Sequence, residues 1–271
     1  MVVTVILLSV LLVAALYVFL VMPRAMAKPD VMPVLCDYAH RGLHKNGGGV
    51  PENSMGAFKR AVDLGIGIEL DVQLTKDGRV VVFHDETLER MCGKRVRVCD
   101  VSYEQLKKER LLGSSYGIPP FSEVLELVGG RVPLLVELKG ESLDDSLCWK
   151  LAPLLDRYGG EFCVQSFNPV LLRWFSKHRE DVIRGQLVTR VSDERGKGNR
   201  VINFMLTHML LNWMSRPDII MCDGRYRDGL EKWVCKNVFR TPFIYWTVQK
   251  RELLAYNHRK GIRSIFEGFE P

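Results

Sequence analysis

The chain has 271 residues, of which 47% are hydrophobic and 26% are charged, and its formal net charge is +6 at pH 7. This composition excludes a disordered or fibrous chain and supplies enough apolar material for one large core, such as an α/β barrel of ~250 residues. The modest positive charge suits an anionic substrate or a membrane surface. Because the sequence carries no nucleic-acid-binding motif, nucleic acid is not an expected partner.

The first residues differ from the rest of the chain. The segment 2–22 holds no charged residue, and roughly 20 apolar residues at about 1.5 Å per residue span a bilayer core. We therefore expect an uncleaved, single-pass membrane anchor over 1–23. A cleaved signal peptide is the alternative, because Ala25-Met26-Ala27 resembles a cleavage site, although the usual charged segment before the apolar run is missing.

Flanking charges predict the side of the membrane on which the remaining chain lies. Arg24 and Lys28 follow the apolar segment and no Lys or Arg precedes it, so the positive-inside rule predicts that the domain after it lies in the cytoplasm. The seven cysteines agree, because an odd and irregular set in a chain of this size is typical of reduced, buried thiols. If the domain lies in an oxidising compartment, a disulfide between Cys92 and Cys99 is the alternative.

After a short linker over 24–34, strand-like runs alternate with helical patterns, which predicts βα units around a parallel sheet. Strands are expected at 35–40, 66–72, 133–139, 162–167, 183–188, 218–222, 243–248 and 263–267. Helices are expected between most of them, at 54–64, 120–128, 143–158 and 169–178. This pattern predicts a (β/α)₈ barrel, the TIM-barrel architecture, over 35–271.

One segment interrupts the alternation. The Asp77-Gly78 step is typical of a hairpin, so residues 79–84 are predicted to return antiparallel to the second strand. The stretch 85–120 that follows exceeds the usual βα loop of roughly 2–6 residues. It indicates a small insertion after the second strand.

Acidic residues lie at the ends of two predicted strands. Glu69 and Asp71 share one face of the first of these strands, because side chains two residues apart point the same way, and Glu137 and Lys139 do so in the second. Three carboxylates offer the hard oxygen ligands of Mg²⁺ or Ca²⁺. We expect Glu69, Asp71 and Glu137 to bind such an ion beside an anion site. An interior Glu137–Lys139 ion pair with solvated acids at the rim is the alternative.

Seven short motifs occur in an order that resembles the glycerophosphodiester phosphodiesterase family, within the phospholipase C-like TIM-barrel phosphodiesterases. They are His40-Arg41-Gly42, Pro51-Glu52-Asn53-Ser54, Glu69-Leu70-Asp71-Val72, His84-Asp85, Glu137-Leu138-Lys139, Ser166-Phe167-Asn168 and Trp246-Thr247-Val248. The resemblance extends from about residue 36 to the C-terminus and includes a small insertion over the barrel mouth. It implies metal-dependent hydrolysis of glycerophosphodiesters to sn-glycerol 3-phosphate and an alcohol.

The resemblance also implies an acid/base pair. It points to His40 and His84, without deciding which is the acid, and two imidazoles suit proton transfer near neutral pH. The remaining histidines are expected to be satisfied core or surface residues; they are His44, His178, His208 and His258.

Substrate-binding roles fall on four further residues. Arg41 and Lys139 are the expected phosphate-binding residues, because guanidinium and ammonium groups both bind phosphate oxygens. Phe167 and Trp246 would form an apolar wall against the glycerol or the head group, with core packing as the alternative. Glu52, in a loop that the resemblance places at the site, is expected behind the first layer of contacts or as a metal ligand.

Two positions depart from the family pattern near the C-terminus. Gln249 follows Trp-Thr-Val where Asn is frequent, and Glu267 stands where many relatives carry Asp. We expect these changes to affect the choice of head group and not the phosphodiester chemistry.

The segment 190–216 combines basic and apolar residues. Arg195, Lys197 and Arg200 precede the apolar run 201–214, which contains Trp213. An ordinary outer helix of the barrel is the expectation, and an interfacial helix in contact with lipid is the alternative. Lipid contact would make lysophospholipids as good a substrate class as water-soluble diesters.

Two other functions therefore stay open beside glycerophosphodiester hydrolysis. One is a lysophospholipase D-type hydrolase that acts on lysophospholipids at the membrane. The other is a non-catalytic sensor of glycerophosphodiesters, against which the presence of both His40 and His84 argues. The oligomeric state is not predicted.

Overall fold

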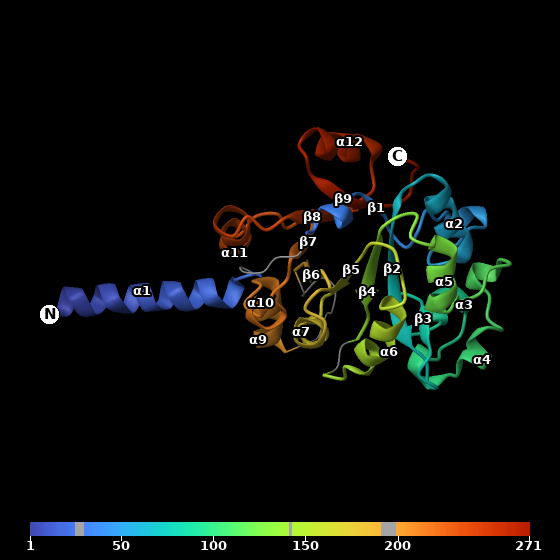
Figure 1. Ribbon diagram of the computed structural model, residues 1–271, viewed down its shortest axis with the longest axis horizontal. Helices are drawn as coiled ribbons and strands as arrows, with labels where there is room; N and C mark the ends of the chain where they lie inside the picture. Colours follow the sequence, from blue (N-terminus) through green and yellow to red (C-terminus); the bar gives the residue numbers. More distant parts are fainter. Residues whose placement is uncertain (25–29, 141–142, 191–198) are drawn as a thin grey trace.

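The computed structural model describes residues 1–24, 30–140, 143–190 and 199–271 (Figure 1). Eight strands, each parallel to its neighbours, form a closed barrel. They are β1 (Tyr38–Ala39), β2 (Gly67–Leu74), β4 (Leu134–Leu138), β5 (Phe162–Ser166), β6 (Arg184–Val188), β7 (Ile219–Asp223), β8 (Phe243–Val248) and β9 (Arg263–Phe266). The barrel closes at β1, because Tyr38 pairs with both Gly67 of β2 and Ile265 of β9. The predicted TIM-barrel fold is confirmed.

The first strand is shorter than the predicted 35–40. Pro33 lies in a 3₁₀ helix, η1 (Met32–Val34), and pairing with the neighbouring strands begins only at Tyr38. Gly42, with a φ of 77°, turns the chain soon after the strand ends. The His40 backbone N–H still donates to the Phe266 carbonyl at 2.9 Å, which extends the contact with β9 by one residue.

The return strand and the insertion also match the prediction. Strand β3 (Val80–Val82) pairs antiparallel with β2, and Val72 lies opposite Val82. The insertion that follows contains α3 (Glu89–Cys92), η3 (Val98–Asp100), α4 (Tyr103–Leu106) and η4 (Leu111–Gly113). It has its own small core, in which Phe83, Leu88 and Leu106 are buried. The insertion is therefore a packed unit on the rim of the barrel.

Helices cover the outside of the barrel (Figure 1). Four of them, α2 (Met55–Asp63), α5 (Phe121–Val128), α6 (Ser146–Leu155) and α7 (Pro169–His178), match the predicted helices to within a few residues. Side-chain caps begin two of them, because Ser54 Oγ accepts from the Ala57 N–H at 3.2 Å and Asn168 Oδ1 from the Val170 N–H at 3.0 Å. Helix α12 (Arg251–Arg259) lies between β8 and β9, and η2 (Asn46–Gly48) lies in the loop before α2.

The apolar run 201–214 differs from the single predicted helix. It forms two short helices, α9 (Arg200–Thr207) and α10 (Asn212–Ser215), separated by a turn in which Met209 has a φ of 56°. No residue of α9 is buried, so it does not pack as an ordinary outer helix. Arg195 and Lys197 lie outside the described residues. Beyond β7, the chain forms α11 (Leu230–Trp233) and the π-helical turn η5 (Val234–Val238).

The interior of the barrel changes character along its axis. Toward the N-terminal ends of the strands it is apolar, with Leu135, Cys163 and Ile219 among its buried residues. Two residues further along β4 and β5, the alternation of side chains brings Glu137 and Gln165 to the same face as Leu135 and Cys163. The polar interior therefore lies toward the C-terminal ends of the strands, where active sites of such barrels are found.

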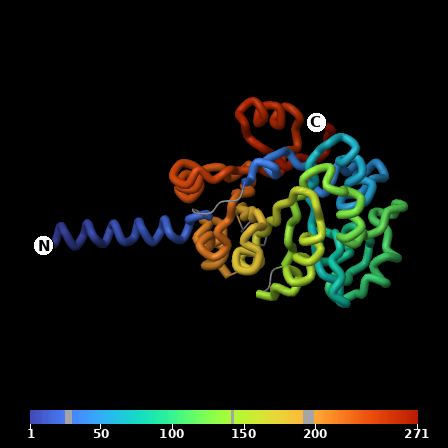
Figure 2. The backbone as a smooth tube through the Cα atoms, in the orientation of Figure 1, coloured from blue at the N-terminus to red at the C-terminus, as the bar shows by residue number. Residues whose placement is uncertain are grey.

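A long apolar helix precedes the barrel. Helix α1 (Val2–Val21) has an 18-residue window of mean hydropathy 2.9 and projects from the domain (Figures 1 and 2). Its length and composition suit either a membrane anchor or a signal peptide. All seven cysteines are free thiols, so the structure contains no Cys92–Cys99 disulfide.

Candidate active site

Three buried carboxylates face one another in the barrel interior. The register of β2 and β4 places Asp71 opposite Glu137, and Glu69 lies two residues before Asp71 on the same face. Ligand oxygens of all three residues lie within 4.8 Å of one another. Glu69 and Asp71 are each 1% exposed and Glu137 is 7% exposed. The three residues predicted as metal ligands thus form one cluster, which we call the acidic cluster.

Lys139 neutralises only part of this cluster. Its Nζ lies 2.5 Å from Glu137 Oε1 and 2.9 Å from Asp71 Oδ1. The Glu137–Lys139 ion pair, considered as an alternative, is therefore present, but the acids beside it are buried and not solvated. Glu69 has two neutral donors instead, since its carboxylate accepts from the Arg41 backbone N–H at 3.0 Å and from Gln165 Nε2 at 3.1 Å.

The charges of the cluster are unequally compensated. Burial and the charges of Asp71 and Glu137 raise the pKa of Glu69 well above its ordinary value. Burial acts on Asp71 in the same direction, but Lys139 and other nearby cations outweigh it and hold its pKa below the ordinary value. Burying a charged carboxylate that is not paired with a cation is energetically unfavourable unless a proton or a metal ion binds to it. The donor set, three close oxygen ligands, fits a divalent cation.

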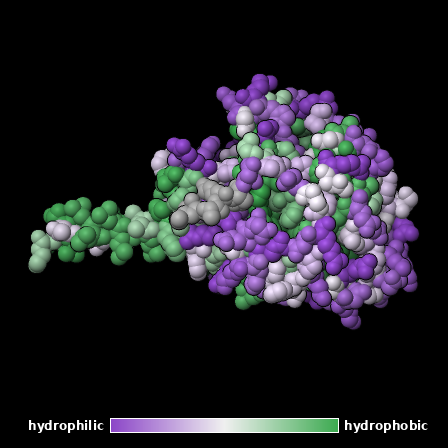
Figure 3. Space-filling model, viewed as in Figure 1, coloured by the Kyte–Doolittle hydropathy of each residue, from purple (hydrophilic) through white to green (hydrophobic). Residues whose placement is uncertain are grey.

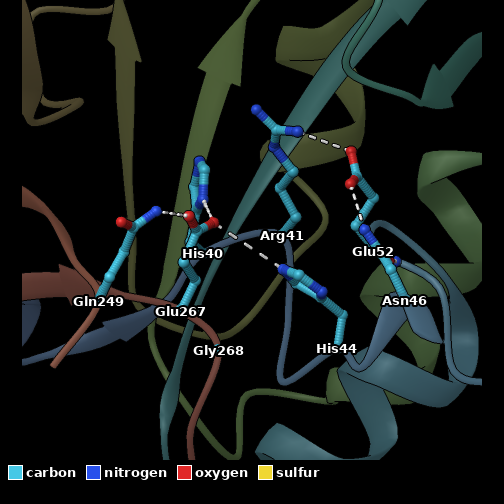
Figure 4. A pocket seen from close by; sticks show the side chains of 8 residues that line it. All are labelled: His40, Arg41, His44, Asn46, Glu52, Gln249, Glu267 and Gly268. Atoms are coloured by element: carbon cyan, nitrogen blue, oxygen red, sulfur yellow. Dashed lines mark hydrogen bonds and ion pairs between the residues drawn. The ribbon is translucent and has the colours of Figure 1, made fainter. Parts of the chain in front are cut away.

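His40 lies at the end of β1 and is held by a carboxylate. Its Nδ1 lies 2.5 Å from Glu267 Oε2, and Gln249 Nε2 donates to Glu267 Oε1 at 2.7 Å (Figure 4). The hydrogen bond with His40, opposed by burial, lowers the pKa of Glu267 to about 2. Gln249 and Glu267, the two departures from the family pattern, are thus joined to each other and to His40.

Arg41 connects the acidic cluster to a second buried carboxylate. Its Nη1 donates to Glu52 Oε1 at 2.6 Å, and its Nε lies 3.5 Å from Asp71 Oδ2. Asn46 and Arg90 also hold Glu52, with Nδ2 of Asn46 at 2.8 Å and Nη2 of Arg90 at 2.7 Å. Glu52 therefore lies behind Arg41 and orients it, and it is not among the clustered ligands.

His84 follows β3 and has its own carboxylate partner. Its Nδ1 lies 2.7 Å from Asp85 Oδ1, and Arg90 Nε donates to Asp85 Oδ2 at 2.7 Å. Arg90 of α3 therefore binds both Asp85 and Glu52, which ties the insertion to the site. Because 38 residues separate Arg90 from Glu52 in the chain, no local pattern in the sequence indicates this contact.

Two cavities open around the acidic cluster. The first, about 430 Å³, is lined by His40, Arg41 and Glu52 with five neighbours (Figure 4). The second, about 680 Å³, is lined by His84, Glu137, Lys139 and Phe167 among others. Asp71 connects the two sides, because it contacts Arg41 of the first cavity and Lys139 of the second. The predicted site residues are therefore gathered in one region of the barrel.

The two predicted aromatic residues pack on each other. The rings of Phe167 and Trp246 meet edge to face with centroids 5.7 Å apart, and Trp246 Nε1 donates to the Met221 carbonyl at 2.9 Å. Phe167 lines the second cavity. Phe167 is thus placed to form an apolar wall, with Trp246 as its support.

His44 differs from the expectation of a satisfied core or surface residue. It lines the first cavity (Figure 4), and neither of its buried ring nitrogens has a hydrogen-bond partner in the part of the chain that the structure describes. Its Nε2 lies 4.0 Å from Glu267 Oε2, and burial lowers its pKa. The other three histidines have partners on the domain surface: His178 stacks on Trp174, His208 lies near Glu231, and His258 pairs with Asp37.

Two amides were missed as site residues by sequence reasoning. Asn53 Nδ2 donates to Asp71 Oδ2 at 2.8 Å, and Gln165 Nε2 binds Glu69. Asn53 belongs to the Pro51-Glu52-Asn53-Ser54 motif, from which only Glu52 was predicted to be a site residue. Gln165 had one usable signal, because it is a polar residue inside an otherwise apolar strand.

The chain is similar in sequence to known phosphodiesterases. The sequence profile of the "Glycerophosphoryl diester phosphodiesterase family" matches residues 40–214. A glycerophosphodiester phosphodiesterase of Caldanaerobacter subterraneus is 43% identical over 148 residues, which cover 50% of this chain and 59% of that protein, less than two thirds of its length. A Bacillus subtilis protein whose name places it in the same family is 37% identical over 84% of this chain and 91% of its own length. A human lysophospholipase D is 33% identical over 44% of this chain and 41% of its own.

Solved structures share the fold. A glycerophosphodiester phosphodiesterase of Thermotoga maritima has 25% identity and a TM-score of 0.64, over 85% of this chain and 94% of that one. An Oleispira antarctica phosphodiesterase in complex with the product sn-glycerol-3-phosphate has 20% identity and a TM-score of 0.68, over 86% and 92% of the two chains.

The environment of Glu52 predicts a pH-dependent loss of stability. Burial alone would raise the pKa of Glu52, but the hydrogen bond from Arg90 and the charge of Arg41 outweigh it and lower the pKa from 4.5 to about 2. The stabilisation is therefore present above the unfolded value of 4.5 and is lost as the pH falls toward 2. Replacing Glu52 with Gln removes one charged partner from Arg41 and one from Arg90. We expect a melting temperature lower by about 6–12 °C at neutral pH, which corresponds to about 3 kcal/mol.

The test is thermal unfolding of the full chain in detergent at several pH values. The difference between wild type and Glu52→Gln should shrink between about pH 5 and about pH 3. Glu89→Gln is the matched control, because Glu89 pairs with Arg95 on the exposed surface of the insertion that carries Arg90, and it should change stability by less than about 0.5 kcal/mol. A difference that stays constant over this pH range would contradict the account of Glu52.

Proposed function

Since the chain belongs to the glycerophosphodiester phosphodiesterase family, we propose that it hydrolyses glycerophosphodiesters, such as glycerophosphocholine or glycerophosphoethanolamine, to sn-glycerol 3-phosphate and an alcohol. The observation that carries this proposal is the acidic cluster, which lies between a cavity that contains His40 and a cavity that contains His84. The sn-glycerol-3-phosphate bound by the Oleispira antarctica phosphodiesterase supports the same product class.

Glu69, Asp71 and Glu137 would hold a divalent cation, Mg²⁺ or Ca²⁺. Such an ion, when bound, would polarise the phosphodiester and offset the negative charge that develops during hydrolysis. The cluster supports this assignment, because Lys139 pairs with only two of its three buried carboxylates and, among the described residues, Glu69 forms no ion pair. Asn53 and Gln165 would keep the carboxylates oriented through their amide hydrogen bonds.

His40 and His84 would transfer the protons of the reaction. Hydrolysis removes a proton from water and delivers one to the oxygen of the leaving alcohol. Glu267 holds Nδ1 of His40 and Asp85 holds Nδ1 of His84, so Nε2 is the nitrogen that each imidazole can offer to the substrate. Which histidine is the acid and which the base stays open.

Lys139 and Arg41 would bind the phosphate oxygens on the two sides of the cluster. Both cations already contact Asp71, so a bound phosphate would lie next to the acidic cluster. Phe167, supported by Trp246, would form the apolar wall that receives the glycerol or the head group. Glu52 would position Arg41 from behind.

A second candidate function is hydrolysis of lysophospholipids at a membrane surface. The observation that favours it is the wall of the larger cavity, which includes Leu74, Leu147, Leu187 and, from α9, Leu206. An apolar wall of this kind suits an acyl chain. The human relative named lysophospholipase D supports the same possibility. A non-catalytic sensor is the remaining alternative.

We propose that α1 stays attached as a single-pass anchor over 1–23, followed by a linker over 24–34 and the barrel over 35–271. The support lies at the end of the helix, where Val21 is fully buried and Arg24 is 8% exposed. Arg24 Nη1 lies 3.5 Å from Asp218 Oδ1, and its Nη2 donates to the Glu180 carbonyl at 2.9 Å. Cleavage after Ala27 would remove these contacts. The charges after α1 favour a cytoplasmic barrel.

Turnover by the full chain in detergent tests the proposed reaction. We expect release of sn-glycerol 3-phosphate from glycerophosphocholine with Mg²⁺ or Ca²⁺, and loss of activity in EDTA that added metal restores. His40→Ala should lower kcat by about 10²- to 10⁴-fold, because a proton-transfer group is gone. His178→Ala is the matched control, because His178 stacks on Trp174 outside both cavities, and it should keep activity.

The same assay with lysophosphatidylcholine separates the candidates. Turnover of the lysolipid alone would replace the first proposal with the second. Saturable binding without turnover of either substrate, with any divalent ion, would point to the sensor. Activity that survives both EDTA and His40→Ala would contradict the proposed site.

The Glu267–His40 contact gives a second prediction. A hydrogen bond to a charged partner contributes about 1.5–3 kcal/mol, so Glu267→Gln should lower kcat by about 10- to 150-fold. The KM should change little, because Glu267 positions His40 and does not bind the phosphate in this account. Glu267→Asp, the residue frequent in relatives, should recover part of the rate. Glu270→Gln is the control, because Glu270 pairs with Arg60 on the surface; equal loss in both Gln variants would refute the role of Glu267.

A further inference from the structure

Exposed apolar side chains gather on three short helices beside the exit of α1. They belong to α9, α10 and α11 and are between 37% and 66% exposed; we call them the collar: Val201, Ile202, Phe204, Trp213, Leu230 and Trp233. Other exposed apolar residues of the globular part, such as Leu64, Leu112 and Trp149, lie on separate elements. Single exposed apolar residues are ordinary, but a group of this size around one point marks an interaction surface.

The end of α1 is fixed among the elements that carry the collar. Asn212 Nδ2 donates to the Val21 carbonyl at 3.0 Å, and Arg216 Nη1 donates to the Met22 carbonyl at 3.0 Å. Cys235 of η5 contacts the same Val21 carbonyl through Sγ at 3.4 Å. Figures 1 and 2 both show α1 leaving the domain between α10 on one side and α11 on the other.

Aromatic contacts extend this junction onto the collar. The ring of Phe19 stacks on Trp213 with centroids 6.3 Å apart, and the Arg216 guanidinium lies 4.9 Å from the centre of the Phe19 ring. Trp213 therefore belongs to the collar and to the contact with α1 at the same time. In Figure 3 the hydrophobic surface of α1 is continuous up to the point where the helix enters the domain.

We propose that the collar is a bilayer-contact surface, which seats the barrel on the membrane around the exit of α1. The inference rests on the proposal that α1 is retained as an anchor. A helix of 20 residues is about 30 Å long, the thickness of the hydrocarbon core, so whatever holds its last turn lies at the level of the lipid head groups. Trp side chains are enriched at that level, because their rings are apolar and their N–H groups are polar.

The charges around the collar fit the same partner. Arg200, Lys236 and Arg240 are exposed and lie on or next to α9 and η5, where they would face anionic head groups. Glu231, the acid at the start of α11, is buried and paired with Lys232 at 2.7 Å. Cations at the rim beside apolar side chains are the arrangement of an interfacial element.

Contact with the bilayer would also connect the collar to the larger cavity. Leu206 lies on α9, the helix that carries Val201, Ile202 and Phe204, and it lines the cavity that contains His84 and Lys139. Helix α9 would therefore meet lipid through Val201, Ile202 and Phe204 and line the candidate substrate cavity through Leu206. This places the cavity wall at the membrane surface.

The test is quenching of tryptophan fluorescence by brominated phosphatidylcholine in liposomes that contain the full chain. Trp233 and Trp149 make a matched pair, because they are 57% and 56% exposed, on α11 and α6 respectively. Trp233→Phe should lower the quenched share of the emission, because one quenched indole of five is gone. Trp149→Phe should leave that share equal or raise it. Trp213→Phe should also lower the quenched share of the emission, which would show that the result does not come from a local effect of one substitution.

Flotation of the liposomes separates failure of the collar from failure of the anchor. If the chain floats with the lipid but Trp233→Phe and Trp149→Phe give the same quenched share, the collar does not contact the bilayer and the anchor stands. If the purified chain has lost residues 1–27, or does not float, the anchor fails and the collar proposal fails with it. Cross-links between collar residues of two chains would assign this surface to a second copy and overturn the proposal. None of these outcomes depends on turnover.

Discussion

The arrangement of the site depends on three carboxylates that are buried together with too few cations. Asp71 and Glu137 lie opposite each other because β2 and β4 pair in register, and Glu69 joins them because side chains alternate along β2. Lys139 pairs with two of the acids, whereas the donors to Glu69 among the described residues are neutral. Burying such charges is unfavourable without compensation. A divalent cation, as proposed, would supply that compensation and, in the same position, would stabilise the charge that develops during phosphodiester hydrolysis.

Carboxylates hold the basic groups around the cluster. Glu267 holds His40, Glu52 holds Arg41, and Asp85 holds His84. Arg90 binds both Glu52 and Asp85, so the insertion that carries Arg90 orients residues on both sides of the acidic cluster. Each catalytic or phosphate-binding candidate is thus held by a second charged residue, which limits its motion before substrate arrives. Helix α1 and the collar would hold the barrel that carries this site at the membrane.

Much of the fold could be predicted from the sequence, because the signals were local. Apolar runs and Asp77-Gly78 marked the strands and the hairpin, and acids at strand ends marked the cluster. Two contacts could not be predicted from the sequence: that of Arg90 with Glu52 and that of His40 with Glu267. The partners are 38 and 227 residues apart, and no local pattern encodes their approach. The position of His44 in the first cavity could not be predicted either, because nothing in the sequence distinguishes it from the other histidines. The turn at Met209, which separates α9 from α10, could not be predicted because the apolar pattern continues through it.

The measurement that tests the central claim most directly is divalent-cation binding to the full chain in detergent, by titration calorimetry with Mg²⁺ and Ca²⁺. The account predicts one saturable site per chain, with affinity about tenfold or more lower in Glu137→Gln. Asp63→Asn is the control, because Asp63 pairs with Lys59 on the exposed surface of α2, and it should bind like wild type. Absence of saturable binding, or equal affinity in wild type and Glu137→Gln, would contradict the claim that the acidic cluster is a metal site.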